Sequence, residues 1–155
     1  MGFIFKLDRD RFSHWQKENT TGQLLTYIHE ESGSALQFSC RTYTGSETLD
    51  LPPDKLIASA TAGIEKIRNP TERSSSSGDC EFGKFGTVLM KGEEPGYYQA
   101  WVLWNTKNEI IFITYTALLP NAQEASQVHQ IAMATSFGQQ NEKPGDLPGF
   151  SISET

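Results

Sequence analysis

The chain has 155 residues and a formal net charge of −6 at pH 7. Apolar residues make up 37% of it and charged residues 21%, which is typical of a soluble globular protein and excludes an extended disordered chain. The length favours one domain with its own core over two domains. Lys and Arg are scattered, so this acidic chain is not expected to bind nucleic acid.

The sequence gives no sign of export or of membrane insertion. It lacks a basic leader followed by a long apolar run, and no apolar run approaches the roughly 20 residues that span a bilayer. We therefore expect a cytoplasmic protein without a membrane partner. Cys40 and Cys80 lack CxxC spacing, so we expect two buried free thiols, with a disulfide as the alternative.

The first part of the chain predicts short strands. They are expected over residues 2–7, 24–29 and 35–43, and the third of these alternates between apolar and polar residues with a period of two. A turn at Gly33 makes the last two strands a hairpin.

A helix is expected after these strands. Pro53 and Asp54 suit its first turn, where proline needs no hydrogen-bond donor and a carboxylate favours the helix dipole. Asn69-Pro70 is predicted to end it. The apolar stripe of this helix consists of Leu56, Ile57, Ala60, Ile64 and Ile67.

The middle of the chain contains its one low-complexity segment. Residues 71–79 include four consecutive serines, and because they cannot bury apolar area, they predict a mobile surface loop. A strand is expected over 80–91, where Gly83 and Gly86 indicate a bulge or a close approach of another segment.

Two aromatic and β-branched strands follow, over 96–104 and 109–116, and residues 105–108 connect them as a hairpin. Trp101 and Trp104 have an odd spacing, so they point to opposite faces of their strand. Because both need cover, we expect a sheet that is covered on both sides.

The last predicted element is a helix that begins after Asn121. Asn121 and Glu124 have the spacing of a capping box, and Gly138 suits the end of the helix. Its inner face is expected to carry Val128, Ile131, Ala132 and Phe137.

Together these elements predict a single α+β domain over residues 1–138, followed by a polar Gly- and Pro-containing tail over 139–155. Consecutive hairpins form antiparallel sheets, so the expected architecture is an antiparallel sheet of about six strands covered by helices, in the order βββ-α-βββ-α.

No motif identifies a reaction, and we expect no catalytic residue, no cofactor and no metal. Residues 78–84 have the spacing of a phosphate-binding loop, but Phe85 stands where a magnesium-binding hydroxyl belongs. His29-Glu30 does not continue into a zinc-protease motif, because Gly33 occupies the position of the second histidine.

Acidic turns and nearby aromatics are the candidates for binding a protein partner. Acidic pairs occur in two turns, and two tyrosines follow the second; at least one tyrosine is expected to belong to the core. The candidate residues are Glu30, Glu31, Glu93, Glu94, Tyr97 and Tyr98.

The order of elements, with the motifs at 101–104 and 109–115 and the closing helix, resembles the Mog1/PsbP-like fold. The segment 33–39 is similar to one near the start of small bacterial immunity proteins that share such sheets. The resemblance covers about residues 24–137. It implies a non-catalytic protein that binds other proteins, as an immunity factor for a toxin, a GTPase partner or a photosystem subunit.

The sequence therefore favours a cytoplasmic immunity protein that neutralises a basic bacterial toxin domain by occluding its active site. The alternative is a small enzyme or ligand-binding domain with a pocket between sheet and helix, around His29 or Cys40. An assembly factor of a larger complex is a third reading. The sequence does not predict the oligomeric state.

Overall fold

The computed structural model describes residues 5–6, 13–18, 24–42, 51–64, 72–92, 96–118 and 122–137. Seven strands form one antiparallel sheet in the order β2-β3-β4-β8-β7-β6-β5, and β1 pairs with β9 beside it. The elements are β1 (Phe5–Lys6), β2 (Trp15–Lys17), β3 (Leu25–His29), β4 (Ala35–Thr42), α1 (Pro53–Gly63), β5 (Glu72–Asp79), β6 (Lys84–Lys91), β7 (Tyr97–Trp104), β8 (Glu109–Ala117), α2 (Ala122–Ala134) and β9 (Ser136–Phe137).

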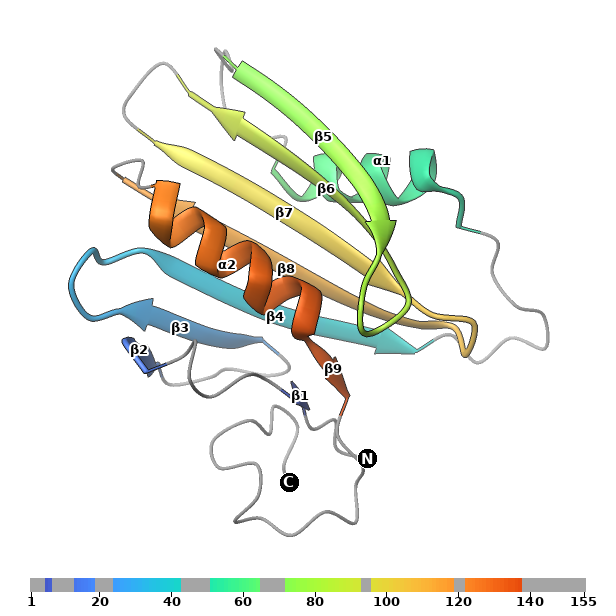
Figure 1. Ribbon diagram of the computed structural model, residues 1–155, viewed down its shortest axis with the longest axis horizontal. Coiled ribbons are helices and arrows are strands. Elements are labelled where there is room, and N and C mark those ends of the chain that lie inside the picture. Colours follow the sequence, from blue (N-terminus) through green and yellow to red (C-terminus); the bar gives the residue numbers. More distant parts are fainter. Residues whose placement is uncertain are drawn as a thin grey trace, which may run out of the picture.

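The two helices lie on opposite faces of the sheet, α2 on one and α1 on the other (Figure 1). This arrangement confirms the predicted α+β class and the antiparallel sheet, with more strands than the six expected. The predicted tail over 139–155 lies outside the described residues. Neither helix in the part of the chain that the structure describes is long and apolar enough to cross a membrane.

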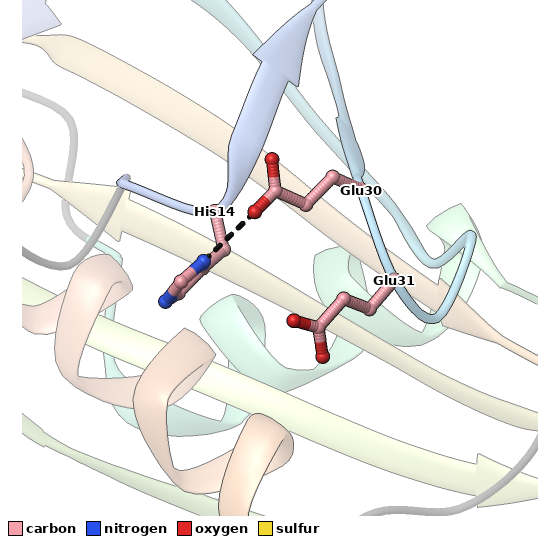
Figure 2. Close-up of side chains that lie close together, drawn as sticks. All are labelled: His14, Glu30 and Glu31. Atoms are coloured by element: carbon pink, nitrogen blue, oxygen red, sulfur yellow. Dashed lines mark hydrogen bonds and ion pairs between the residues drawn. The ribbon is translucent and has the colours of Figure 1, made fainter.

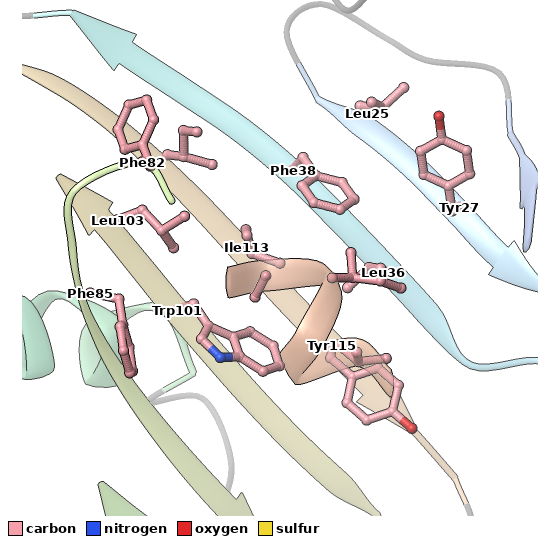
Figure 3. Packing of buried hydrophobic residues seen from close by; sticks show 14 of the residues in the cluster. Leu25, Tyr27, Leu36, Phe38, Phe82, Phe85, Trp101, Leu103, Ile113 and Tyr115 are labelled. Carbon is pink, nitrogen blue, oxygen red and sulfur yellow. The ribbon is translucent and has the colours of Figure 1, made fainter. Parts of the chain in front are cut away.

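Two apolar clusters fill the space between the sheet and its helices. Trp101 lies in the larger cluster, under α2, and Trp104 lies in the smaller one, under α1. The prediction that these indoles face opposite sides is confirmed. Figure 3 shows the larger cluster, in which aromatic and branched side chains from β3, β4, β6, β7 and β8 meet α2. Its most deeply buried members include Leu25, Leu36, Phe38, Leu103, Ile111 and Ile113.

A close approach between α1 and β6 explains the glycine at position 86. A Cβ atom there would lie 2.7 Å from the backbone of Leu56 and Ile57, so only glycine lets the helix pack this near the strand. The predicted close approach is therefore confirmed. Helix α1 ends at Gly63; its predicted end at 69–70 and Ile67 lie outside the described residues.

The two hairpins predicted from the sequence, β3–β4 and β7–β8, are confirmed. Gly33 turns between β3 and β4 with a φ of 74°, in the left-handed region that favours glycine. Between β7 and β8, Asn108 has a φ of 61°, which asparagine tolerates, and the Asn105 side chain accepts from the backbone N–H groups of Lys107 and Glu109.

The predicted loop over 71–79 is wrong, because residues 72–79 form strand β5. This strand pairs with β6 along its whole length, from Glu72 opposite Lys91 to Asp79 opposite Lys84. Strand β6 is mostly buried, and its backbone N–H and C=O groups on the side away from β7 need partners. The serine run of β5 supplies these partners with its backbone and buries none of its side chains. Apolar periodicity therefore does not reveal this strand.

Gly86→Ala tests the contact between α1 and the sheet. We expect a loss of about 1–3 kcal/mol in the free energy of unfolding, because the added methyl group forces the helix backbone away. Gly63→Ala is the matched control, since its Cβ would meet only Ala100 Cβ, at 4.0 Å, and alanine favours a helix. Urea unfolding measures both, and equal stabilities for the two variants would contradict the close approach.

Candidate functional site

A cavity of about 350 Å³ opens at the end of the sheet where the β3–β4 turn meets α2. One wall consists of His14, which precedes β2, and of the β3–β4 turn. The other wall is the first half of α2. The lining side chains are His14, His29, Glu31, Ser32, Gln123, Glu124 and Gln127. All seven are polar or charged, which suits a polar ligand or a side chain of a partner.

A buried carboxylate joins α2 to the turn at this cavity. Glu124 is only 5% exposed, and its oxygens accept hydrogen bonds from the hydroxyl groups of Ser32 at 2.5 Å and Ser34 at 2.7 Å. The Tyr115 hydroxyl donates a third hydrogen bond. A capping box was predicted for this residue, but its carboxylate binds three hydroxyl groups, and Asn121 lies outside the described residues.

The pKa of Glu124 reflects this network. Burial alone would raise it, but the hydrogen bonds from Ser32, Ser34 and Tyr115, together with the nearby His29, outweigh burial and lower the pKa below its ordinary 4.5. The carboxylate therefore stays ionised at neutral pH. It provides a buried negative charge at the edge of the cavity.

His29, at the end of β3, holds the turn in shape. Its Nδ1 accepts from the backbone N–H groups of Glu31 and Ser32, each at 3.2 Å. Nδ1 also lies 3.7 Å from Oε1 of Glu124. The edge of the ring meets Trp15 with a centroid distance of 5.0 Å, which ties the turn to β2.

The outer rim of the cavity carries an exposed His–Glu pair. His14 Nδ1 lies 2.9 Å from Oε1 of Glu30, and the Glu31 side chain points to the same space (Figure 2). The hydrogen bond with Glu30, assisted by the charges of Glu30 and Glu31, raises the pKa of His14, although desolvation opposes it. His14 therefore carries its proton to higher pH than an isolated histidine.

Among the residues that the structure describes, these same three side chains are placed to hold a metal ion. Ligand atoms of His14, Glu30 and Glu31 lie within 4.8 Å of one another, and imidazole with carboxylates is a donor set that divalent transition metals accept. All three are exposed. The sequence did not reveal this group, because His14 lies 16 residues before Glu30 and only the β2–β3 pairing brings them together.

The predicted partner-binding residues have different surroundings. Glu30 and Glu31 are exposed at the cavity. Tyr97 and Tyr98 begin β7 at the same end of the sheet, and both are half-buried. Tyr97 packs on the core, edge to face with Tyr115 at 5.6 Å, which confirms that at least one tyrosine belongs there. The pair Glu93 and Glu94 lies outside the described residues.

The remaining nucleophile and base candidates lie elsewhere. Both cysteines are free; Cys40 is buried as predicted, but Cys80 is only half-buried. Burial, with a smaller effect of Glu109, raises the pKa of Cys40 to about 12, and burial also raises the pKa of Cys80. His129 accepts from Trp101 Nε1 at 3.2 Å, and burial lowers its pKa. At neutral pH these thiols are protonated and the imidazole is neutral.

No protein-family model matches this sequence, and no curated protein matches it significantly. Among solved structures, a point mutant of Protein Mog1 is similar, with a TM-score of 0.46 and 10% identity over 76% of this chain and 74% of that chain. Similarity at this level transfers no partner and no residue role. Nothing in these comparisons concerns immunity proteins.

Glu124→Gln tests the buried carboxylate. We expect a loss of about 1–3 kcal/mol in the free energy of unfolding at neutral pH, because charge-assisted hydrogen bonds are weakened. The folded-state pKa is lowered, so this stabilisation is present above pH 4.5 and disappears as the pH falls through the lower folded-state value. The difference in the free energy of unfolding between the natural protein and Glu124→Gln should therefore disappear in acid.

Urea unfolding at several pH values measures this gap. Glu31→Gln is the control, since it removes an exposed carboxylate from the same cavity and should change stability by less than about 0.5 kcal/mol. A gap that stays constant down to low pH would contradict an ionised Glu124.

Proposed function

We propose that this protein binds another protein without catalysing a reaction, as a cytoplasmic immunity protein that occludes the active site of a basic toxin domain. The observation that carries the proposal is the acidic cavity at the β3–β4 turn. Exposed Glu30 and Glu31 stand at its rim, and buried Glu124 stands behind them.

Charge supports a basic partner. The chain as a whole is acidic, and the carboxylates of Glu31 and Glu124 line this cavity together with two imidazoles, while Glu30 pairs with His14 at the rim. An acidic patch accelerates the encounter with a basic catalytic cleft, and it disfavours acidic partners. The cavity has room for a Lys or Arg side chain of the partner, whose charged end would approach Glu31 and Glu124.

The state of the potential nucleophiles supports binding without chemistry. The thiols of Cys40 and Cys80 are held protonated by burial, and protonated thiols are poor nucleophiles. Glu124 is engaged by three hydroxyl donors, an arrangement that favours a fixed structural carboxylate over a proton-transfer group.

Co-expression with the toxin domain encoded beside this chain tests the proposal. We expect protection of the host cell and a stable complex, and we expect Glu31→Lys to lower the association rate about tenfold or more, because it reverses a rim charge. Surface plasmon resonance at low and high salt measures that rate.

Glu81→Lys is the matched control. It reverses the charge of an exposed glutamate in the β5–β6 turn, at the opposite end of the sheet, and should leave the rate nearly unchanged. Absence of a complex, or equal effects of the two variants, would remove the proposal.

The cavity also supports a second candidate, a binding site for a small positively charged ligand. Convergent polar groups around His29 in a cavity between turn and helix are what such a site requires. Saturable binding of a small polyamine to the isolated protein, lost in Glu31→Lys and kept in Glu81→Lys, would favour this candidate over the first.

A further inference from the structure

In the part of the chain that the structure describes, no strand pairs with the outer side of β5, so it is an edge of the sheet. It forms the outermost strand beyond β6 (Figure 1), and every residue from Glu72 to Asp79 is exposed. Edge strands are normally shielded by shortness, proline, a bulge or a charge in the middle. This strand is eight residues long, and it carries charges only at its ends. Its centre consists of small neutral residues over 74–78.

We propose that β5 pairs with β5 of a second copy of this chain, antiparallel about a two-fold axis perpendicular to the sheet. The two seven-stranded sheets then form one continuous sheet. Such an axis keeps the face under α2 on the same side in both protomers. A residue of one copy and the residue opposite it in the second copy must therefore point to the same face of the sheet. Their residue numbers then differ by an even number, because side chains alternate between the faces along a strand.

One register pairs seven of the eight strand residues, from Arg73 to Asp79. It places Ser76 on the axis, opposite Ser76 of the second copy. Arg73 then stands opposite Asp79, and by symmetry this ion pair forms twice. A register with Ser75 on the axis would also pair seven residues, 72–78, but only the register with Ser76 on the axis brings Arg73 opposite Asp79. The strand is thus complementary in charge to itself, which favours a second copy over an unrelated peptide.

The side chains between the two ion pairs fit the same register. Ser74 would face Gly78, and Ser75 would face Ser77, so no bulky pair hinders the approach of the backbones. The Gly78 position is backed by the ring of Phe85, 3.3 Å from where a Cβ would lie. The guanidinium of Arg73 donates a long, exposed hydrogen bond of 3.3 Å to Thr61 Oγ1, and such a bond is easily exchanged for an ion pair.

A charge exchange tests the pairing by sedimentation equilibrium over a concentration series. The natural chain should dimerise reversibly, and Arg73→Asp and Asp79→Arg should each weaken self-association about tenfold or more, because like charges then face each other twice. An equimolar mixture of the two variants should form a heterodimer, and the double variant should regain the homodimer. A merely structural role of these residues would not produce this pattern.

A disulfide trap tests the register. In a Cys80→Ser background, Ser76→Cys should form an intermolecular disulfide under mild oxidation, because the two Cβ atoms face each other across the axis. Ser74→Cys is the matched control and should cross-link at least tenfold more slowly, since residue 74 faces residue 78. A chain that stays monomeric at every concentration, single variants that dimerise as well as the natural chain, or equal cross-linking at both positions would each overturn the proposal.

Discussion

Burial of both faces of the central strands is the constraint on which the rest of this structure depends. In β7 and β8 nearly every side chain is buried or half-buried, and Trp101 and Trp104 lie on opposite faces of β7. Because side chains alternate along a strand, one helix covers only half of this apolar surface. The chain therefore places α1 on one face and α2 on the other, and Gly86 removes the side chain that would keep α1 away.

The same constraint creates the candidate site. To cover its face, α2 must cross the end of the sheet where the β3–β4 turn projects. The contact between helix and turn is polar, since the Glu124 carboxylate binds Ser32, Ser34 and Tyr115. A buried charge that is satisfied by three donors holds the helix to the turn in a single arrangement. The cavity keeps a defined shape because its two walls are joined by this carboxylate.

The features that follow from apolar periodicity could be predicted from the sequence: the hairpins, the two-sided sheet and the buried face of α2. Strand β5 could not, because its pairing rests on backbone groups and its side chains give no pattern. Glu124 has the spacing of a helix cap, and only the packing of α2 on the turn brings it to Ser32 and Ser34. The approach of His14 to Glu30 likewise depends on strand pairing between distant segments, which local spacing does not encode.

The proposed dimer and the proposed binding site are compatible because they occupy opposite edges of the sheet. Five strand spacings separate β5 from β3 in one protomer. In a continuous sheet the two β3 strands would therefore be roughly 50 Å apart, at about 4.8 Å per spacing. The two-fold axis also points the two β3–β4 turns in opposite directions along the strands. Each cavity could then bind its own partner without contact between the partners. Pairing through β5 would thus change the number of sites per particle and leave the affinity of each site unchanged, because no residue of one cavity comes from the other protomer.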